Sequence, residues 1–361
     1  MHREPPKRDL GLAVVGAGKI GSLRARLAAE HAAVRRLVIV DVDAPSAAAL
    51  AEAVGADAWS TDLDAVVGSD AVDAVIVSTP EGAHREPVVT ALGGGKRVLV
   101  EKPIALTLED ADVMTGAGGD LRVAYSMRYA QRYAVAKQQL DEGRIGSVVG
   151  GLARVYDTVA VGRAILGRSP TAGPVADILT YAIDILCWYL PTRPVEVTAR
   201  GHGTILRGEG HDVDDLVFAL VTFEDGTTFS LAVSYSLPAG FPIAGLATRF
   251  EILGDAGVLF VTEDHGDQVL YSDRGYDNAY VDQHLNLAYL GSRTSGEWAA
   301  GRMFGRVADE TRAWLDHLSS GAPCHITTGE QARQVLAVTT AIEESARTGG
   351  AVAIDRREET A

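Results

Sequence analysis

A lysine that follows a buried strand is the first candidate for chemistry in this sequence. In RVLVEKPIAL (97–106), an apolar run leads into Glu101, Lys102 and Pro103. An ammonium group at a strand end can bind an oxygen of a ligand, or it can simply be solvated. One tripeptide does not separate these two interpretations, so the neighbouring motifs must decide.

A carboxylate and a phenol share a second segment, VADILTYAIDILCWYL (175–190). Asp177, Tyr181 and Asp184 fall at i, i+4 and i+7 of the expected helix, which puts them on one stripe. A helix this apolar must bury most of its surface, and buried polar groups need partners. Tyr181 is therefore either a group that moves a proton or an aromatic side chain of the core, with Asp177 then a salt-bridged acid.

The hexapeptide GAGKIG (16–21) has the spacing of a dinucleotide-binding loop, G-x-G-x-x-G. It follows an apolar strand and precedes a helix, and Asp41 ends the next strand 20 residues after Gly21. Such glycines permit a tight turn, a close approach to a pyrophosphate at the helix start, and close helix–strand packing. The expected contacts in this loop are Gly16, Gly18, Lys19, Ile20 and Gly21.

Asp41 bears on which dinucleotide is bound. A carboxylate accepts hydrogen bonds from ribose hydroxyls and repels a 2′-phosphate, which predicts NAD as the cofactor in preference to NADP. The alternative is that Asp41 only caps the following helix.

The elements that must position these residues alternate through residue 125. We expect strands at 10–16, 35–43, 71–80, 96–103 and 121–129, with helices at 19–31, 45–55, 84–95 and 107–118. This alternation predicts an α/β fold with a doubly wound parallel sheet of the Rossmann type. Ligands bind at the carboxyl ends of such strands. The further cofactor contacts expected there are Ser78, Thr79, Pro80, His84, Glu101 and Lys102, with His84 alternatively a plain helix N-terminal residue.

The second half of the chain has a different pattern of apolar and polar residues. Longer alternating segments predict antiparallel strands at 147–160, 195–206, 214–236 and 247–264, with helices at 134–143, 175–190, 304–320 and 329–348 and a last short strand at 351–354. We therefore predict two domains: 1–127, which binds the nucleotide, and 128–361, an α+β domain with a large, mostly antiparallel open sheet. The stretch 273–303 lacks clean periodicity and is expected to be a long loop.

Composition excludes several classes of function. The 361 residues carry 33 basic and 48 acidic side chains, a net charge of −15, which disfavours nucleic acid and anionic membranes as partners. Only two cysteines occur, and no Cys/His spacing suits a metal such as zinc. The first residues have no apolar stretch of a signal peptide, and no run reaches the ~18 apolar residues of a membrane span. We expect a cytoplasmic protein.

Taken in order, the glycine loop, the strand ending in Asp41, STPEGAH (78–84) and EKP (101–103) resemble the glucose–fructose oxidoreductase / inositol dehydrogenase (Gfo/Idh/MocA) family. The resemblance continues through SMRYAQRY, DEGRIGSVVGG and AGPVADILTYAIDIL, and so covers nearly the whole chain. It implies a nicotinamide cofactor and hydride transfer at an alcohol carbon of a sugar, inositol or related polyol. It also implies a homodimer or homotetramer formed through the open face of the C-terminal sheet.

The resemblance assigns Lys102 to the family's EKP lysine and Asp177 to the aspartate of its D-x-G-x-H motif. Here that motif reads DILTY, with Leu179 and Tyr181 at the glycine and histidine positions. Tyrosine there is similar to the glucose–fructose oxidoreductase and dimeric dihydrodiol dehydrogenase branches. Because a free phenol has a pKa near ~10, an adjacent ammonium would be needed to make it a base. Tyr181 is the expected acid/base and Lys102 its electrostatic partner, with Asp177 orienting the substrate; the reverse assignment makes Lys102 the base.

Several further possibilities stay open at this point. Weaker candidates for contacts with the small-molecule substrate are Arg128, Tyr156, Arg163 and His284, each of which also has a structural explanation. The substrate can instead be a cis-dihydrodiol, suggested by Tyr181 and by the apolar ILCWYL that continues its helix. Two other classes are a non-redox lyase or hydrolase that uses NAD transiently, and a catalytically silent NAD-binding regulator.

Overall fold

The computed structural model describes residues 9–241, 246–263, 269–277, 284–289, 297–299 and 302–356. The chain forms two compact units, one of residues Met1–Tyr129 with Gly296–Arg333, the other of Ala130–Ser295 with Gln334–Ala361. The predicted second domain, 128–361, is thus interrupted, because 296–333 belongs to the first unit. A short strand in that segment adds to the first unit's sheet, which the sequence signal did not indicate.

The first unit is built on a seven-stranded sheet in the order β17-β6-β5-β4-β1-β2-β3. All neighbouring pairs are parallel except β17 with β6. The 3-2-1-4-5-6 order of its parallel strands is that of the Rossmann fold and confirms the predicted fold class. The strands are β1 (Leu10–Val15), β2 (Val34–Val40), β3 (Ala58–Ser60), β4 (Ala74–Val77), β5 (Arg97–Glu101), β6 (Leu121–Ala124) and β17 (Thr327–Thr328).

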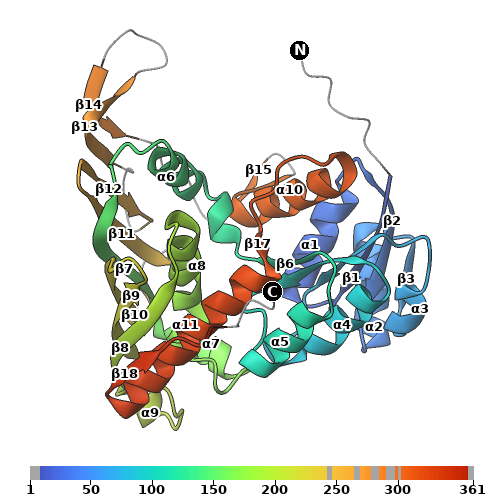
Figure 1. The fold of residues 1–361 in the computed structure, drawn as a ribbon. Helices are drawn as coiled ribbons and strands as arrows, with labels where there is room; N and C mark the ends of the chain where they lie inside the picture. Colours follow the sequence, from blue (N-terminus) through green and yellow to red (C-terminus); the bar gives the residue numbers. More distant parts are fainter. Residues whose placement is uncertain are drawn as a thin grey trace. The chain divides into compact units, whose positions relative to one another are not determined.

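Helices cover both faces of this sheet (Figure 1). They are α1 (Lys19–Ala29), α2 (Ala44–Val54), α3 (Leu63–Val67), α4 (Arg85–Gly93), α5 (Leu108–Gly116) and α10 (Arg306–Ser320), with the short turns η1 (Glu81–Ala83) and η2 (Ser126–Tyr129). Local sequence explains the ends of α2: Asp43 accepts from the Ser46 amide at its start, and Gly55 ends it at φ 67°. Trp314, Leu315 and Leu318 of α10 join the apolar core formed by α1, α2 and the strands.

The second unit has a nine-stranded sheet in the order β14-β13-β12-β11-β7-β10-β9-β8-β18. Among the strand pairs that the structure describes in this sheet, only β7–β10 is parallel, so the predicted mostly antiparallel sheet is confirmed. Its strands are β7 (Val148–Thr158), β8 (Pro194–His202), β9 (Leu216–Phe223), β10 (Thr228–Leu237), β11 (Ala247–Gly254), β12 (Gly257–Thr262), β13 (Val269–Asp277), β14 (His284–Tyr289) and β18 (Ala351–Ala353).

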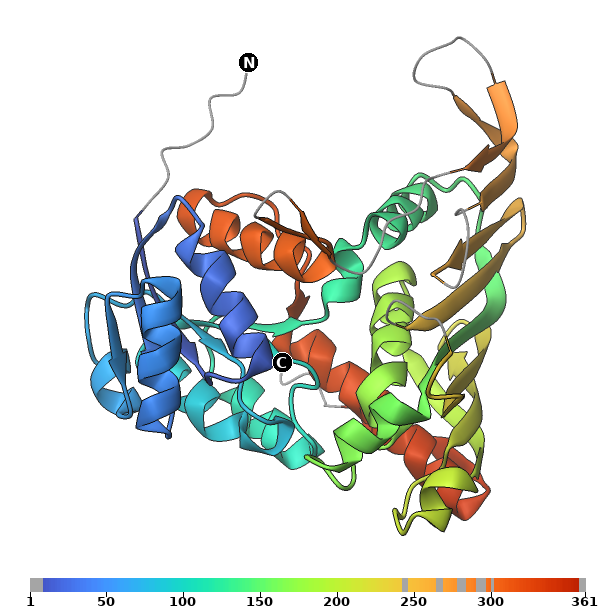
Figure 2. The same ribbon diagram turned by 180° about the vertical axis from the view of Figure 1, so that it is seen from behind.

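Helices pack against one face of this second sheet, as Figure 2 shows from behind. They are α6 (Gln131–Asp141), α7 (Val159–Leu166), the π-helical turn η3 (Val175–Leu179), α8 (Thr180–Tyr189), α9 (Ile205–Gly208) and α11 (Gly329–Thr348). The long loop predicted at 273–303 is wrong for its described part. Strands β13 and β14 pair there, and β15 (Glu297–Ala299) pairs with β16 (Arg302–Phe304), since backbone pairing overrides the weak local pattern.

Candidate functional site

The glycine loop is shaped by close backbone contacts. Gly16 has φ 101°, and a Cβ there would lie 2.6 Å from the Ser78 carbonyl oxygen. A Cβ at Gly21 would lie 1.8 Å from the Gly16 carbonyl oxygen, so helix α1 approaches the loop too closely for any side chain. A Cβ at Gly18 would meet nothing within 4 Å. The two outer glycines are thus required by packing, and the middle one leaves open space.

That open space lies at the start of α1. Gly18 is the N-cap and offers no side-chain cap, and Gly18, Lys19 and Ile20 are all exposed. The first N–H groups of a helix have no acceptor within the helix and attract anions. The loop therefore fits a pyrophosphate, the group that the Rossmann fold holds at this position.

Asp41 follows β2 and reaches back to the same loop. Its carboxylate accepts from the Ala17 amide at 2.6 Å and from the Asp43 amide at 2.9 Å. A carboxylate has about four acceptor sites, so these two bonds leave capacity for ribose hydroxyls. Because Asp43, and not Asp41, caps α2, the capping alternative for Asp41 is wrong.

The end of β4 completes this part of the site. The Ser78 hydroxyl is buried without a hydrogen-bond partner, and its Cβ would lie 3.4 Å from a Cβ at Gly21. Thr79 donates from its hydroxyl to the Ala83 carbonyl at 3.1 Å, and Pro80 is exposed. A buried hydroxyl without a partner beside the glycine loop is a group that a bound dinucleotide can satisfy.

Glu101, at the end of β5, is held by an arginine that sequence reasoning did not single out. Its Oε1 accepts from Nε of the buried Arg24 at 2.8 Å. Lys102 follows, half-buried, and the Lys102–Pro103 peptide bond is cis. The carboxylate of Glu101 is thus engaged within the protein, whereas its expected cofactor contact stays a prediction.

His84 is buried among backbone carbonyls. Its Nδ1 lies 3.0 Å from the Pro103 oxygen and 3.2 Å from the Ile104 oxygen, while Nε2 lies 3.1 Å from the Thr79 oxygen. Burial lowers the pKa of the ring, and these carbonyl oxygens oppose that shift. His84 thus joins the loops that follow β4 and β5.

Arg128 is also buried in the first unit. Its Nη1 donates to the His325 carbonyl and to the Gln331 side chain, each at 3.3 Å. These contacts favour the structural explanation of Arg128 over a substrate contact.

In the second unit, Asp177 lies in a π-helical turn that the sequence could not reveal. The turn η3 spans Val175–Leu179, and regular α-helix begins at Thr180. The i, i+4 stripe expected for Asp177 and Tyr181 assumed one continuous α-helix, so that expectation is wrong across this turn. π-turns frequently mark functional sites.

Asp177 has a partner that sequence reasoning missed. The Tyr235 hydroxyl on β10 donates to Asp177 Oδ2 at 2.5 Å, and both side chains are buried. Burial, and then the charge of Asp177, raises the pKa of Tyr235 well above its usual range. Tyr235 therefore stays a phenol and a hydrogen-bond donor.

A second carboxylate, Asp157 of β7, belongs to the same cluster. Asp157 is 6% exposed, and its Oδ1 accepts from the Thr158 amide at 2.7 Å. Burial raises its pKa to about 6; the Thr158 amide opposes this shift, and the charge of Asp177 adds to it. The parallel pairing of β7 with β10 brings Asp157 beside Tyr235, a signal that no local motif carries.

Tyr181 and Asp184 lie on α8, where Tyr181 is half-buried and Asp184 fully buried. A proton role for Tyr181 stays a prediction. The structure brings Asp177, Tyr235 and Asp157 into one cluster, with Tyr181 on the adjoining helix.

The weaker candidates lie in other surroundings. Tyr156 packs under the Arg154 guanidinium at 5.0 Å, on the face of β7 opposite Asp157, because side chains alternate along a strand. Arg163 is half-exposed and forms a two-point ion pair with Glu209 at 2.9 and 2.5 Å. These placements favour structural roles for both. The side chain of His284, the first residue of β14, lies outside the described residues.

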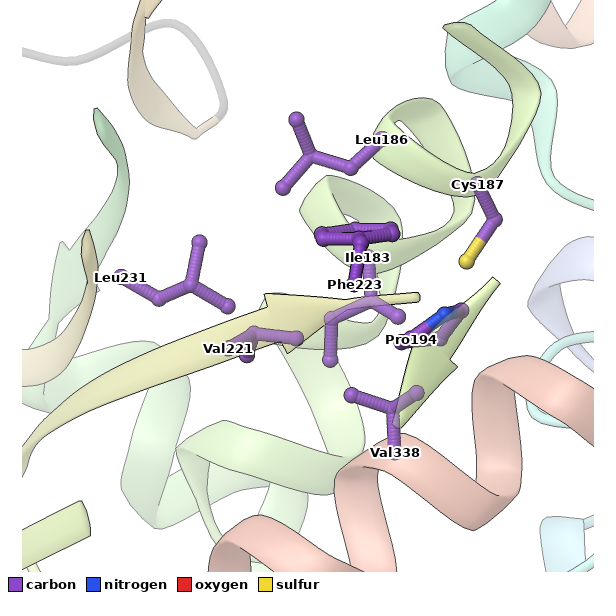
Figure 3. Close-up of a pocket in the computed structure, with 8 residues that line it drawn as sticks. All are labelled: Ile183, Leu186, Cys187, Pro194, Val221, Phe223, Leu231 and Val338. Atoms are coloured by element: carbon purple, nitrogen blue, oxygen red, sulfur yellow. The ribbon is translucent and has the colours of Figure 1, made fainter. Parts of the chain in front are cut away.

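Two residues of the ILCWYL segment, Leu186 and Cys187, line a small apolar pocket. It lies between α8, β8–β10 and α11 in the second unit and is lined by Ile183, Leu186, Cys187, Pro194, Val221, Phe223, Leu231 and Val338 (Figure 3). Its lining carries no charged side chain, so it does not suit a polyol. Packing of α8 on the sheet thus explains the apolar residues that had suggested a dihydrodiol substrate.

Within the described part of the chain, no three His, Cys, Asp or Glu side chains gather as a metal ion would require. No helix among the described residues is long and apolar enough to cross a bilayer.

Family models match both halves of the chain. The model described as "Oxidoreductase family, NAD-binding Rossmann fold" matches residues 10–128, and the Gfo/Idh/MocA C-terminal domain model matches residues 133–260. The chain belongs to the Gfo/Idh/MocA family. The family resemblance carried by the glycine loop and EKP is thereby confirmed, as is an NAD-binding N-terminal domain.

Individual relatives vary in activity. The scyllo-inositol 2-dehydrogenase (NAD(+)) of Bacillus subtilis is 28% identical over 73% of this chain and 77% of its own length. The 2,7-anhydro-N-acetylneuraminate hydratase of Mediterraneibacter gnavus is 29% identical over 60% of this chain and 59% of its own length. Scyllo-inositol dehydrogenase from Lactobacillus casei, solved with NAD(H) and scyllo-inositol, has a TM-score of 0.76 at 21% identity over 96% of this chain and 99% of its own. That last similarity supports the fold.

Proposed function

We propose that this protein is an NAD-dependent dehydrogenase that transfers a hydride between nicotinamide and a secondary alcohol carbon of a cyclic polyol or sugar. The relatives named as inositol dehydrogenases support this substrate class. NAD, when bound, accepts or donates the hydride, and the protein supplies orientation and the path of the proton.

One observation carries the proposal: the glycine loop is open at Gly18 and bounded by Asp41. Gly16 and Gly21 leave no room for side chains, whereas Gly18 leaves room for a ligand. Since Asp41 is anionic and engages the loop amide of Ala17, it favours ribose hydroxyls over a 2′-phosphate. The cofactor of this proposal is therefore NAD, with the pyrophosphate held by the start of α1.

The proton path is assigned to Lys102, Tyr181 and Asp177. Tyr181 exchanges the proton of the substrate hydroxyl, and the ammonium of Lys102 favours the phenolate that this requires. Asp177, held by Tyr235, accepts a hydrogen bond from the substrate and orients it. Exchanging the roles of Lys102 and Tyr181 gives the alternative assignment, which the substitutions in the Discussion distinguish.

A single screen tests the function. Purified protein is incubated with NAD or NADP and a panel of inositols, sugars, anhydrosugars and cis-dihydrodiols, and absorbance at 340 nm reports reduced cofactor. We expect NADH with at least one polyol or sugar. NADH formed from dihydrodiols alone would mean that the substrate is a cis-dihydrodiol and not a polyol or sugar. NAD binding without turnover of any compound would favour a catalytically silent NAD-binding regulator.

A non-redox reaction is the second candidate, because one relative is named a hydratase. In that case the bound NAD would be reduced and reoxidised within each turnover, and no NADH would accumulate. Loss of substrate, measured by mass spectrometry in samples without absorbance change at 340 nm, would identify it. Anhydrosugars belong in the panel for this reason.

Assembly and location complete the proposal. Phe218 and Leu220 of β9 are 52% and 51% exposed, which supports a homodimer or homotetramer formed through the second unit's sheet. Phe218→Asp together with Leu220→Asp should lower the mass measured by light scattering, and an unchanged oligomer would exclude this face. A reducing cytoplasmic compartment is proposed because both cysteines are free thiols; cell fractionation tests it.

A further inference from the structure

Arg24 joins three elements of the first unit. It lies on α1 and is 1% exposed. Its Nε donates to Glu101 at the end of β5 at 2.8 Å, and its Nη2 donates to Glu310 of α10 at 2.7 Å. Its Nη1 donates to the Thr311 hydroxyl at 2.6 Å. One guanidinium thus fixes the strand end next to Lys102 against two helices.

This network is not explained by stability alone. Burial acts to lower the pKa of Arg24, but the charges of Glu101 and Glu310 outweigh it and raise the pKa above its usual range. Buried ion pairs often contribute no more stability than apolar side chains of the same size, because desolvation offsets their attraction. The planar guanidinium of Arg24 instead fixes the relative positions of its three acceptors, because its hydrogen bonds are directional and lie in one plane.

His84 holds the other side of Lys102. Its ring lies between the Thr79 carbonyl, after β4, and the carbonyls of Pro103 and Ile104, after β5. Arg24 binds residue 101, and His84 contacts residues 103 and 104. The side chain of the residue before Lys102 and the backbone of the two residues after it are therefore both held.

We infer that Arg24 and His84 are positioning residues for Lys102, which set the place of its ammonium group without touching the substrate. This inference rests on the proposed function, in which Lys102 acts at the reacting oxygen. A misplacement of about 1 Å can cost ~10²-fold in rate, so holding both flanks of Lys102 has a direct effect on catalysis.

Kinetics of matched variants test the inference. Arg24→Lys keeps the charge but loses the planar geometry, and His84→Phe keeps a ring but loses both nitrogens. Arg333→Lys is the control, because Arg333 is buried in the same unit and binds Asp112 of α5 at 3.0 and 3.3 Å. We expect kcat to fall about tenfold to ~10²-fold in the first two variants, with a near-normal kcat in Arg333→Lys.

The positioning role also predicts non-additivity. In a Lys102→Ala background, Arg24→Lys and His84→Phe should lower the residual kcat by less than about twofold, since Lys102 is no longer there to be misplaced. The same proportional loss in both backgrounds would overturn the inference. If Arg24→Lys does not fold, Thr311→Val takes its place in the test, because it removes one acceptor of Arg24. The expected pattern is the same, with a smaller fall in kcat.

A substrate-free measurement separates this inference from the proposed function. Acetic anhydride labelling of the folded protein across pH, quantified peptide by peptide, reports the reactivity of Lys102, with Lys96 as internal reference. We expect Arg24→Lys and His84→Phe to shift the Lys102 labelling profile and Arg333→Lys to leave it in place. Unchanged profiles in both positioning variants overturn the inference, whereas an inactive wild-type protein with shifted profiles overturns only the proposed function.

Discussion

The glycine loop of the first unit and the acidic cluster of the second unit are assembled in different ways. In the loop, the Ala17 amide donates to Asp41, 24 residues away in the chain, and the backbone of Gly16 lies against the backbone of Ser78. In the cluster, Asp177 receives its hydrogen bond from Tyr235, 58 residues away, and lies near Asp157 on a third element. The loop depends on backbone geometry, and the cluster depends on single side-chain atoms brought together by the sheet.

This difference leads to different sensitivities. Substitutions around the loop should act on cofactor affinity and preference, because the backbone supplies most of the pyrophosphate contacts. Substitutions in the cluster should act on turnover and on its pH dependence, because its carboxylates are held by single hydrogen bonds such as that from Tyr235 to Asp177.

Lys102→Ala should have the largest effect on turnover. If the ammonium acts in the transition state, its removal should lower kcat by about 10²–10⁴-fold while NAD affinity is retained. Steady-state kinetics, together with NAD titration by tryptophan fluorescence, measure both quantities. Near-normal turnover would mean that Lys102 is only a solvated charge at the end of a strand.

Tyr181→Phe tests whether the Tyr181 hydroxyl on α8 transfers the proton of the substrate. The ring is kept and only the hydroxyl is removed, so the protein should fold while kcat falls by about 10²-fold or more. A loss below about tenfold, with an unchanged pH profile, would make Lys102 the base. Tyr181→His is the companion: recovery of the activity lost in Tyr181→Phe would mean that this position carries protons whichever residue supplies them.

Tyr235→Phe should affect turnover through Asp177. Removing this hydroxyl takes one hydrogen bond from a buried carboxylate, a loss of about 1.5–3 kcal/mol for a charged hydrogen bond. We expect kcat/KM to fall about tenfold to ~10²-fold. Tyr189→Phe is the matched control, because Tyr189 is also a buried phenol but donates to the Tyr133 backbone oxygen at 2.9 Å. Equal losses in the two variants would remove the catalytic argument for Tyr235.

The same contrast explains how much the sequence could predict. Gly16, Gly18, Gly21 and Asp41 were predictable because a short motif encodes a backbone shape and its consequences. Tyr235 and Asp157 carry no motif, and they matter only because β10 pairs with β7 in one particular register. The π-turn at Asp177 was likewise hidden, since the sequence pattern around it fits a regular helix.

The fold shows the same limits. The long apolar strands β1, β2, β4 and β5 were predicted to within a few residues, because burial on both faces gives a continuous apolar run. The edge strand β3 has three residues, none fully buried, and was missed. The strand expected over 121–129 ends at Ala124 and continues as the turn η2, and Val159–Leu166 forms helix α7 after β7. Tertiary packing, not local pattern, fixes such ends.

Asp41→Asn should change cofactor preference with little effect on turnover at saturating NAD. The amide oxygen can still accept a loop N–H, so the loop is preserved, but the negative charge that repels a 2′-phosphate is lost. We expect the ratio of NADP to NAD affinity to rise about tenfold, equivalent to about 1.4 kcal/mol. Isothermal titration with each cofactor measures it, and an unchanged ratio would show that Asp41 does not select the cofactor.

Asp157→Asn should have the smallest effect, and its sign depends on pH. The pKa of Asp157 is raised from 3.8 to about 6 in the folded protein, chiefly by burial. A raised acid pKa favours the protonated form on folding, so its contribution to stability is full below pH ~3.8 and is lost as pH rises through ~6. At pH 8 the ionised Asp157 thus destabilises the second unit, by about 1–2 kcal/mol after allowance for solvent screening. Asparagine is neutral at every pH and can still accept from the Thr158 amide.

We therefore expect Asp157→Asn to raise Tm by a few degrees at pH 8 and by progressively less toward pH 4, where the two proteins should converge. Thermal melts of both proteins from pH 4 to 8 measure this. A gain that is the same at every pH would mean that the effect is one of packing and that Asp157 does not titrate beside Asp177.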